Sequence, residues 1–128
     1  MSKLILIDDD PIYQKIAELM VHEYSPVKEV VTSADGRATL EYLEKNKENE
    51  ANLPDYIFLD LNMPEYSGWD FLNGYKKVYN SFKKAIHIYI VSSSIDPRDI
   101  KRSKDYSFVD SFITKPLNRD FLRGLVDV

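Results

Sequence analysis

Residues 56–59, Tyr-Ile-Phe-Leu, form a short uninterrupted apolar run that ends in Asp60, and this kind of run decides the fold class. Short apolar runs are typical of strands that are buried on both faces, as in parallel sheets. Four other runs lie at residues 4–7, 27–31, 86–91 and 112–113. His87 interrupts the run at 86–91, and the run at 27–31 is the weakest.

Between these runs lie segments in which apolar residues recur at helical spacing and share one face. These residues are Ile12, Ile16, Leu19 and Met20, then Leu40 and Leu43, then Phe71, Leu72, Tyr75 and Tyr79, and last Phe121, Leu122 and Leu125. Pro11 and Pro97 each follow an aspartate, as a proline in the first turn follows a helix N-cap. The alternation of strands and helices predicts an α/β domain with a doubly wound, five-stranded parallel sheet and helices on both faces.

The length of 128 residues predicts a single domain over residues 1–128. A net charge of -4 argues against nucleic-acid binding through bulk electrostatics. The absence of cysteine excludes a disulfide scaffold and a thiolate metal site. No apolar run is long enough for a signal-peptide core or a membrane span, so a cytoplasmic chain without membrane contact is expected.

Polar residues follow the predicted strands at the point where each strand ends. A doubly wound sheet with the order 2-1-3-4-5 binds ligands beyond the carboxyl ends of its strands. We therefore expect these side chains to converge on one edge of the sheet. They are Asp8-Asp9-Asp10 after the first run, Asp60 after the third, Ser92-Ser93-Ser94 after the fourth and Thr114-Lys115-Pro116 after the fifth.

A group of carboxylates at this edge predicts a divalent metal site. Clustered carboxylates repel one another, and this raises the pKa of some of them unless a cation intervenes. Oxygen ligands favour Mg²⁺, and Mn²⁺ or Ca²⁺ can substitute for it. Asp8, Asp9 and Asp60 fit such a site and leave room for a phosphoryl group. Asp60 is then the nucleophile, with Lys115 and Ser92 contacting the phosphoryl oxygens.

Each of these features also has an ordinary structural interpretation. An acidic run after a strand is often a solvated turn. The serines at positions 92–94 suit a loop or a helix cap, and Lys115 with Pro116 suits a charged edge followed by a turn. The expected convergence of all these residues on one edge favours the functional interpretation.

The chain resembles the receiver domain of two-component response regulators over essentially its whole length, in the stand-alone form of a chemotaxis regulator. The resemblance implies a flavodoxin-like α/β fold with the strand order 2-1-3-4-5 and five helices. The motifs that carry it are LILIDDD at residues 4–10, FLDLNMPEYSGWDFL at 58–72, IVSSS at 90–94 and ITKPL at 113–117.

The resemblance implies a role for each residue of the predicted site. Asp60 would be the phosphoacceptor. Asp8 and Asp9 would hold Mg²⁺ together with Asp60, and Asn62 would supply its backbone carbonyl to the metal. Lys115 would contact the phosphoryl group.

The resemblance also implies a conformational switch and two structural positions. Ser92 would bind a phosphoryl oxygen and act as the switch hydroxyl, and Phe112 would be the switch aromatic residue. The bond between Lys115 and Pro116 would be cis, and Gly68 would ease the turn into the third helix. Residues 106–110 depart from the small residues usual in the family, so the end of the fourth helix is not predicted.

The implied function is a phosphorylation-activated switch in a two-component system or phosphorelay. A sensor histidine kinase or a histidine phosphotransfer protein would donate the phosphoryl group from phosphohistidine. The chain would catalyse only its own phosphorylation and dephosphorylation. No output domain follows the last predicted helix, so a stand-alone receiver or part of a longer protein is expected. An unidentified downstream protein would bind the face of the fourth helix, fifth strand and fifth helix, which carries Arg98, Lys101, Arg102 and Arg119.

Two other functions fit parts of the sequence. The first is a small aspartyl-phosphate phosphatase in which Asp8 is the nucleophile, although Ile12 stands where such enzymes usually have threonine or valine. The second is an interaction module that works without phosphorylation. Nothing in the sequence supports this second alternative, because the acceptor, the acidic pair, the hydroxyl and the lysine are all present.

Overall fold

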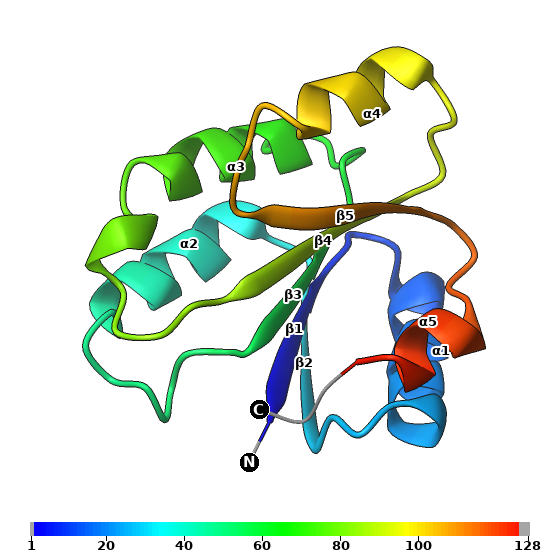
Figure 1. Cartoon of the computed structure of the whole chain (residues 1–128), viewed down its shortest axis with the longest axis horizontal. Coiled ribbons are helices and arrows are strands. Elements are labelled where there is room, and N and C mark those ends of the chain that lie inside the picture. Colours follow the sequence, from blue (N-terminus) through cyan, green and yellow to red (C-terminus); the bar gives the residue numbers. More distant parts are fainter. Residues whose placement is uncertain (1, 126–128) are drawn as a thin grey trace.

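The structure is a computed structural model that describes residues 2–125. Its strands form one parallel sheet in the order β2-β1-β3-β4-β5 (Figure 1). This confirms the flavodoxin-like order that the sequence predicts. The strands are β1 (Lys3–Ile7), β2 (Glu29–Ser33), β3 (Tyr56–Leu59), β4 (His87–Ser92) and β5 (Val109–Thr114).

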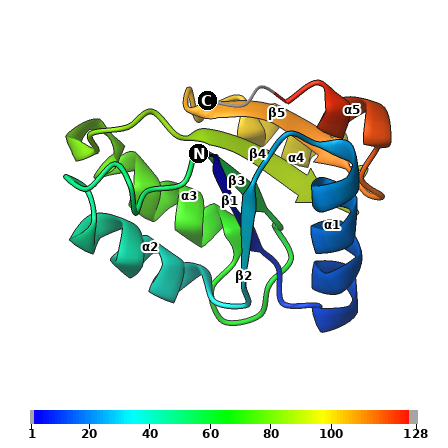
Figure 2. The ribbon, with the colours of Figure 1, turned by 90° about the horizontal axis from the view of Figure 1, so that it is seen from below.

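Helices cover both faces of the sheet. Helices α1 and α5 lie on one face, and α2, α3 and α4 lie on the other (Figure 2). Within the described residues, no helix is both long enough and apolar enough to cross a membrane. The helices are α1 (Pro11–Tyr24), α2 (Gly36–Lys45), α3 (Gly68–Lys76), α4 (Pro97–Ser103) and α5 (Arg119–Arg123), with a short 3₁₀ turn at Tyr79–Ser81.

Side chains along β1 alternate between the two faces of the sheet. Leu4 and Leu6 pack in the core beneath α1 and α5, whereas Ile5 and Ile7 pack in the core beneath α2 and α3. None of these four side chains is more than 4% exposed. The uninterrupted apolar run is thus a strand buried on both faces, as predicted.

The two aspartate-proline pairs begin helices as predicted. The Asp10 carboxylate accepts hydrogen bonds from the backbone N–H groups of Ile12 and Tyr13, at 3.0 and 3.3 Å. Asp96 accepts one from Arg98 N–H at 2.9 Å at the start of α4. In each helix a proline occupies the first turn, where its missing N–H costs nothing.

The apolar spacing predicts the extent of α1 but not the face that packs. Ile12, Ile16 and Leu19 are 72, 51 and 56% exposed, whereas Ala17 and Val21 are buried. A second apolar stripe runs through Ala17 and Val21 at the same spacing, next to the first. The small Ala17 allows this second stripe to pack closely on the sheet, which leaves the first stripe in solvent.

Helix α4 is short because the chain after it turns back into the core. The helix ends at Ser103, and the Tyr106 side chain, three residues further on, is buried in the core beneath α2 and α3. The Tyr106 hydroxyl donates a hydrogen bond to Asn73 Oδ1 on α3 at 2.7 Å. A large aromatic residue therefore stands where the resemblance leads us to expect a small one, and it connects the α4–β5 loop to α3.

Candidate functional site

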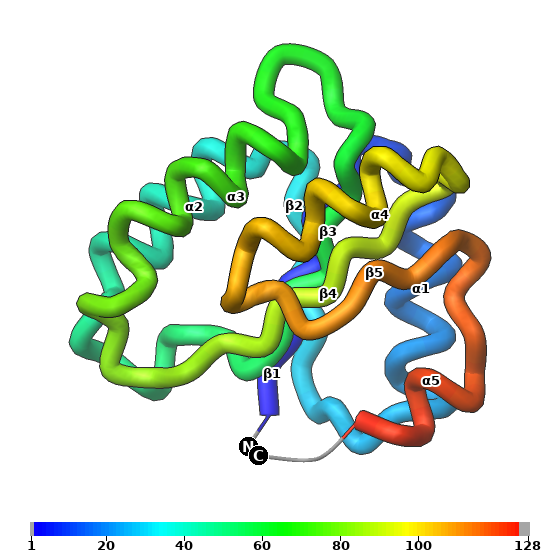
Figure 3. The backbone as a smooth tube through the Cα atoms, turned by 45° about the horizontal axis from the view of Figure 1, so that its top comes forward, coloured from blue at the N-terminus to red at the C-terminus, as the bar shows by residue number. Residues whose placement is uncertain are grey.

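The segments that follow β1, β3 and β4 leave the sheet on the same side (Figure 3). Backbone pairing continues past the ends of β3 and β5 and fixes the first residue after each of these strands. The Asp60 N–H donates to the Ile7 carbonyl at 3.0 Å, and the Lys115 N–H donates to the Ser92 carbonyl at 2.8 Å. The sheet itself therefore brings Asp60, Lys115 and the end of β1 to one edge.

Three carboxylates meet at this edge. Asp8, Asp9 and Asp60 each contribute a carboxylate oxygen, and these oxygens lie within 4.8 Å of one another. Asp8 is 1% exposed and Asp60 is 5% exposed, whereas Asp9 is more open to solvent. Lys115 Nζ lies 2.8 Å from Asp8 Oδ2 and 3.7 Å from Asp60 Oδ1. One ammonium group thus pairs with two of the three carboxylates, and the cluster carries excess negative charge.

This excess of negative charge contributes to a shift in the pKa of Asp60. Burial raises the pKa of the Asp60 carboxyl, and the negative charge of Asp8 raises it further. The Lys115 ammonium and a hydrogen bond from the Asn62 backbone N–H lower that pKa and only partly offset the rise. Three oxygen donors with excess negative charge form the kind of site that binds a hard divalent cation.

Asp8 is held more firmly than Asp60. Its Oδ1 atom accepts a hydrogen bond from the Asp10 backbone N–H at 2.9 Å, and its Oδ2 atom accepts one from Lys115 Nζ at 2.8 Å. Its backbone carbonyl accepts a hydrogen bond from the Gln14 side chain. Asp8 is therefore bound through both carboxylate oxygens, which suits a fixed metal ligand better than an attacking group.

The predicted switch residues lie on β4 and β5. Ser92 is fully buried at the end of β4, where its Oγ atom accepts a hydrogen bond from the Ser94 N–H at 3.2 Å. Phe112 is half-buried on the edge strand β5, opposite Ile90 of β4. Phe112 packs against the core beneath α3 and also lines a cavity of about 370 Å³ between β5 and α4.

Gly68 is required by a close approach of backbones. A Cβ atom at this position would lie 2.5 Å from the Asp60 carbonyl oxygen and 2.8 Å from Leu61 Cα. The Gly68 N–H donates to the Leu61 carbonyl at 3.1 Å, so the first turn of α3 rests directly on the segment that carries Asp60. On the other side of the site, the peptide bond between Lys115 and Pro116 is cis.

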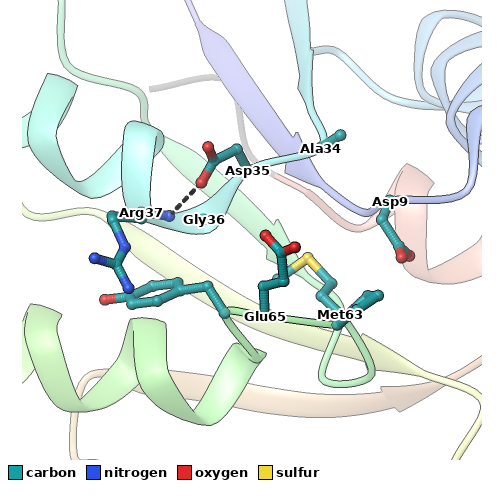
Figure 4. A pocket seen from close by; sticks show the side chains of 9 residues that line it. Asp9, Ala34, Asp35, Gly36, Arg37, Met63 and Glu65 are labelled. Atoms are coloured by element: carbon teal, nitrogen blue, oxygen red, sulfur yellow. Dashed lines mark hydrogen bonds between the residues drawn. The ribbon is translucent and has the colours of Figure 1, made fainter.

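A cavity of about 480 Å³ opens beside Asp9, as Figure 4 shows. Its walls come from the N-cap and first turn of α2, with Asp35 and Arg37, and from the β3–α3 loop, with Met63 and Glu65. The exposed side of the carboxylate cluster therefore borders a solvent-accessible space.

Sequence reasoning missed Tyr13, in the first turn of α1. The Lys115 ammonium lies 4.0 Å from the centroid of the Tyr13 ring. The helix start at Asp10 was the available signal, because a helix that begins beside Asp8 places its first turn next to the strand ends. Lys115 is separated from Tyr13 by most of the chain, so no local pattern links the two residues.

Comparison with known proteins assigns the family. The response regulator receiver domain matches residues 4–127 of the chain. A probable C4-dicarboxylate response regulator, DctR from Halalkalibacterium halodurans, is 29% identical over 122 residues, which cover 95% of this chain and 48% of the relative. The chain thus spans about half the length of this curated relative.

Solved structures agree with this assignment. A two-component response regulator from Cytophaga hutchinsonii is 28% identical with a TM-score of 0.84, and the match covers 94% of this chain and 90% of that chain. The receiver domain of the histidine kinase CKI1 from Arabidopsis thaliana, complexed with Mg²⁺ and BeF₃⁻, is 26% identical with a TM-score of 0.75. That match covers 92% of this chain and 83% of that chain. The chain therefore belongs to the response regulator receiver domain family, whose members are signalling modules of two-component systems.

Proposed function

We propose that residues 1–128 act as one receiver domain that accepts a phosphoryl group on Asp60 from a phosphohistidine. The donor is a sensor histidine kinase or a histidine phosphotransfer protein. One observation carries the proposal: the buried Asp60 carboxylate shares an edge of the sheet with Asp8 and Asp9, and Lys115 is the one cation paired with this cluster among residues 2–125. The carboxylates of such a site repel one another, and a divalent metal ion relieves this repulsion and can bind a phosphoryl oxygen.

In the transfer step, an Asp60 carboxylate oxygen attacks the phosphorus atom in line with the donor imidazole. The new oxygen–phosphorus bond forms while the nitrogen–phosphorus bond breaks. The electron pair of the broken bond goes to the imidazole nitrogen, and the donor leaves as neutral imidazole because its other ring nitrogen carries a proton. Positioning and charge neutralisation, more than proton transfer, lower the barrier of such a reaction.

Asp8, Asp9 and Asp60 are the residues that would hold Mg²⁺, with the Asn62 backbone carbonyl as a further ligand. The metal supplies positive charge next to the phosphoryl oxygens. The CKI1 receiver domain, which was crystallised with Mg²⁺ and BeF₃⁻, supports this assignment by similarity. Lys115 lies within reach of both Asp8 and Asp60 and supplies a second positive charge to the transferred group.

Phosphorylation would change the face that α4, β5 and α5 form. The phosphoryl group draws the Ser92 hydroxyl toward it, and Phe112 moves into the vacated space. Two features support this switch: Ser92 is fully buried, and Phe112 borders the cavity between β5 and α4. A downstream protein would bind this face, where Arg98, Lys101, Arg102 and Arg119 are exposed.

The donor protein has to approach Asp60 from the edge of the sheet where α1 begins. The exposed apolar stripe of Ile12, Ile16 and Leu19 starts two residues beyond the Asp10 cap of this helix. Exposed apolar surface of this kind marks contacts between proteins. We infer that the donor covers this stripe while its phosphohistidine reaches Asp60.

The two alternatives from the sequence are not favoured. A phosphatase that uses Asp8 would need that carboxylate as a nucleophile, but hydrogen bonds from Lys115 and the Asp10 N–H to its two oxygens make them weaker nucleophiles. A module that works without phosphorylation would not need a buried cluster of carboxylates, whose repulsion costs stability. The family assignment favours the receiver function over both.

The test uses acetyl phosphate, a small acyl phosphate, as the phosphodonor in the presence of Mg²⁺. Wild type is expected to gain one phosphoryl group by intact-mass spectrometry, and Asp60→Asn to gain none. Addition of a chelator is expected to suppress the label. Labelling of Asp60→Asn to the same extent as wild type, or no labelling of wild type at saturating Mg²⁺, would contradict the proposal.

A further inference from the structure

The Tyr13 ring covers one side of the Lys115 ammonium group. Lys115 Nζ lies 4.0 Å from the ring centroid, 2.8 Å from Asp8 Oδ2 and 3.7 Å from Asp60 Oδ1. The lysine ammonium group has three N–H donors and no acceptor. With one side against the aromatic face, the remaining donors are turned toward Asp8 and the phosphoacceptor Asp60.

The position of the Tyr13 ring is fixed by the start of α1. Asp10 accepts the backbone N–H of Tyr13 at 3.3 Å and that of Ile12 at 3.0 Å, and Pro11 sets the backbone angle of the first turn. The ring also packs against the core beneath α1 and α5. The acidic run 8–10 therefore has two functions, since Asp8 and Asp9 belong to the site while Asp10 positions the helix that carries Tyr13.

The Tyr13 hydroxyl is buried and makes no hydrogen bond within residues 2–125. A buried hydroxyl without a partner costs stability, so the hydroxyl does not explain why a tyrosine occupies this position. The aromatic face has the clearer use. A lysine has a flexible four-carbon stem, and a ring that attracts its ammonium group restricts where that group rests. An aromatic ring also leaves the positive charge in place, whereas another carboxylate would neutralise it.

We propose that Tyr13 is a positioning residue that holds the Lys115 ammonium against the phosphoryl-binding side of Asp60. This inference rests on the proposed phosphoacceptor function. The ring acts through Lys115 and does not touch the transferred group. The contribution of the ring should be greatest when the phosphoryl group arrives, because the Lys115 ammonium is then already placed to bind the phosphoryl oxygens.

The test compares wild type with Tyr13→Phe, which keeps the ring, and Tyr13→Leu, which removes it. The rate of labelling by acetyl phosphate is measured at saturating Mg²⁺. Tyr13→Phe is expected to label at the wild-type rate and to be no less stable. Tyr13→Leu is expected to label more slowly by about 2- to 30-fold, the range that corresponds to a cation–π contact.

Tyr24→Leu is the matched control. Tyr24 lies at the other end of the same helix, and its ring contacts Arg123 on α5 at 5.5 Å from the centroid. This variant loses the same groups from α1 and a contact of the same kind, but far from the site. It is expected to label at the wild-type rate. A general effect of damage to α1 would slow both leucine variants.

A second readout follows the contact itself and does not depend on phosphoryl transfer. The ring current of Tyr13 is expected to shift the ε-methylene proton resonances of Lys115 upfield in the NMR spectrum of the wild type. Tyr13→Phe is expected to keep this shift and Tyr13→Leu to lose it. Because the wild type alone reveals the shift, the contact can be tested even if Tyr13→Leu does not fold.

The outcomes separate this inference from the proposed function. Failure of the wild type to label contradicts the phosphoacceptor proposal, while the NMR shift still reports the contact. If the wild type labels and Tyr13→Leu labels equally fast, the positioning role is wrong. If Tyr13→Phe is as slow as Tyr13→Leu, the hydroxyl and not the ring carries the effect, and the inference is overturned.

Discussion

Two buried aspartates flank β3, and they have opposite surroundings. Asp55 and Asp60 are each 5% exposed. Asp55 forms an ion pair with Lys84 at 3.2 Å and accepts a hydrogen bond from the Lys3 backbone N–H at 2.9 Å. Asp60 instead shares Lys115, 3.7 Å away, with Asp8, and Asp9 adds a third carboxylate to the cluster.

The difference shows that burial alone does not mark a functional carboxylate. At Asp55 one cation and one N–H donor match one carboxylate, which is a stable structural arrangement. At Asp60 the negative charges exceed the positive ones, and this excess favours protonation or the binding of a cation. The ratio of cations to carboxylates therefore distinguishes the end of β3 at Asp55 from the end at Asp60, where we propose that the phosphoryl group is accepted.

The largest expected effect comes from removing the lysine at each end. Lys115→Ala is expected to slow phosphorylation by acetyl phosphate about a hundredfold, because it removes a cation placed at the developing charge. Lys84→Ala is expected to label at the wild-type rate but to lose about 3 kcal/mol of unfolding free energy, since Asp55 stays buried without its cation. Labelling kinetics and urea unfolding of both variants measure these two effects. Slow labelling of Lys84→Ala as well would erase the distinction.

Removal of the metal is the next largest effect. At a free Mg²⁺ concentration about 100-fold above its dissociation constant, the metal should add about 2.7 kcal/mol to the unfolding free energy. Asp9→Asn is expected to lose most of this gain, whereas Asp55→Asn should keep it in full. Urea unfolding with Mg²⁺ and with a chelator measures the gain. An equal gain in Asp9→Asn would place the metal elsewhere.

Replacement of Asp55 by asparagine tests the structural end. Asp55→Asn keeps the shape of the side chain but leaves Lys84 without a counter-charge, so a loss of about 1–3 kcal/mol in unfolding free energy is expected. The variant should still gain one phosphoryl group with Mg²⁺. If Asp55→Asn is as stable as the wild type, the ion pair between Asp55 and Lys84 does not stabilise the fold, and the structural role of Asp55 is wrong.

The smallest expected effect is a dependence of stability on pH in the absence of metal. Burial and the Asp8 charge raise the pKa of Asp60, so the folded protein binds this proton more tightly than the unfolded chain. The resulting stability is present below the ordinary aspartate pKa of 3.8 and is lost as the pH rises through the raised value. Without metal, Asp60→Asn should therefore gain stability relative to the wild type across this window and keep the gain at neutral pH. Urea unfolding in chelator at several pH values measures the difference, and a difference that is independent of pH would contradict the account.

Much of the fold could be predicted from local features of the sequence. Apolar runs predict the central strands because β1 and β3 are buried on both faces, and the aspartate-proline pairs predict the starts of α1 and α4. The packed face of α1 could not be predicted. Two adjacent apolar stripes satisfy the helical spacing, and only contact with the sheet selects the one that contains Ala17 and Val21.

The candidate site was predictable to the same degree and for the same reason. Asp8, Asp60 and Lys115 follow apolar runs, so the carboxyl ends of parallel strands place them together. Tyr13 could not be predicted as a neighbour of Lys115, because their contact depends on the direction in which α1 leaves the sheet. Asp55 escaped notice because it precedes β3, and its partner Lys84 precedes β4.

The most direct measurement identifies the aspartate that receives the phosphoryl group. After reaction with acetyl phosphate and Mg²⁺, reduction by borohydride converts a phosphorylated aspartate to homoserine, which peptide mass spectrometry locates. The account predicts homoserine at position 60 and unmodified aspartate at positions 8 and 55. Homoserine at either of these two positions, or the absence of any conversion, would contradict it.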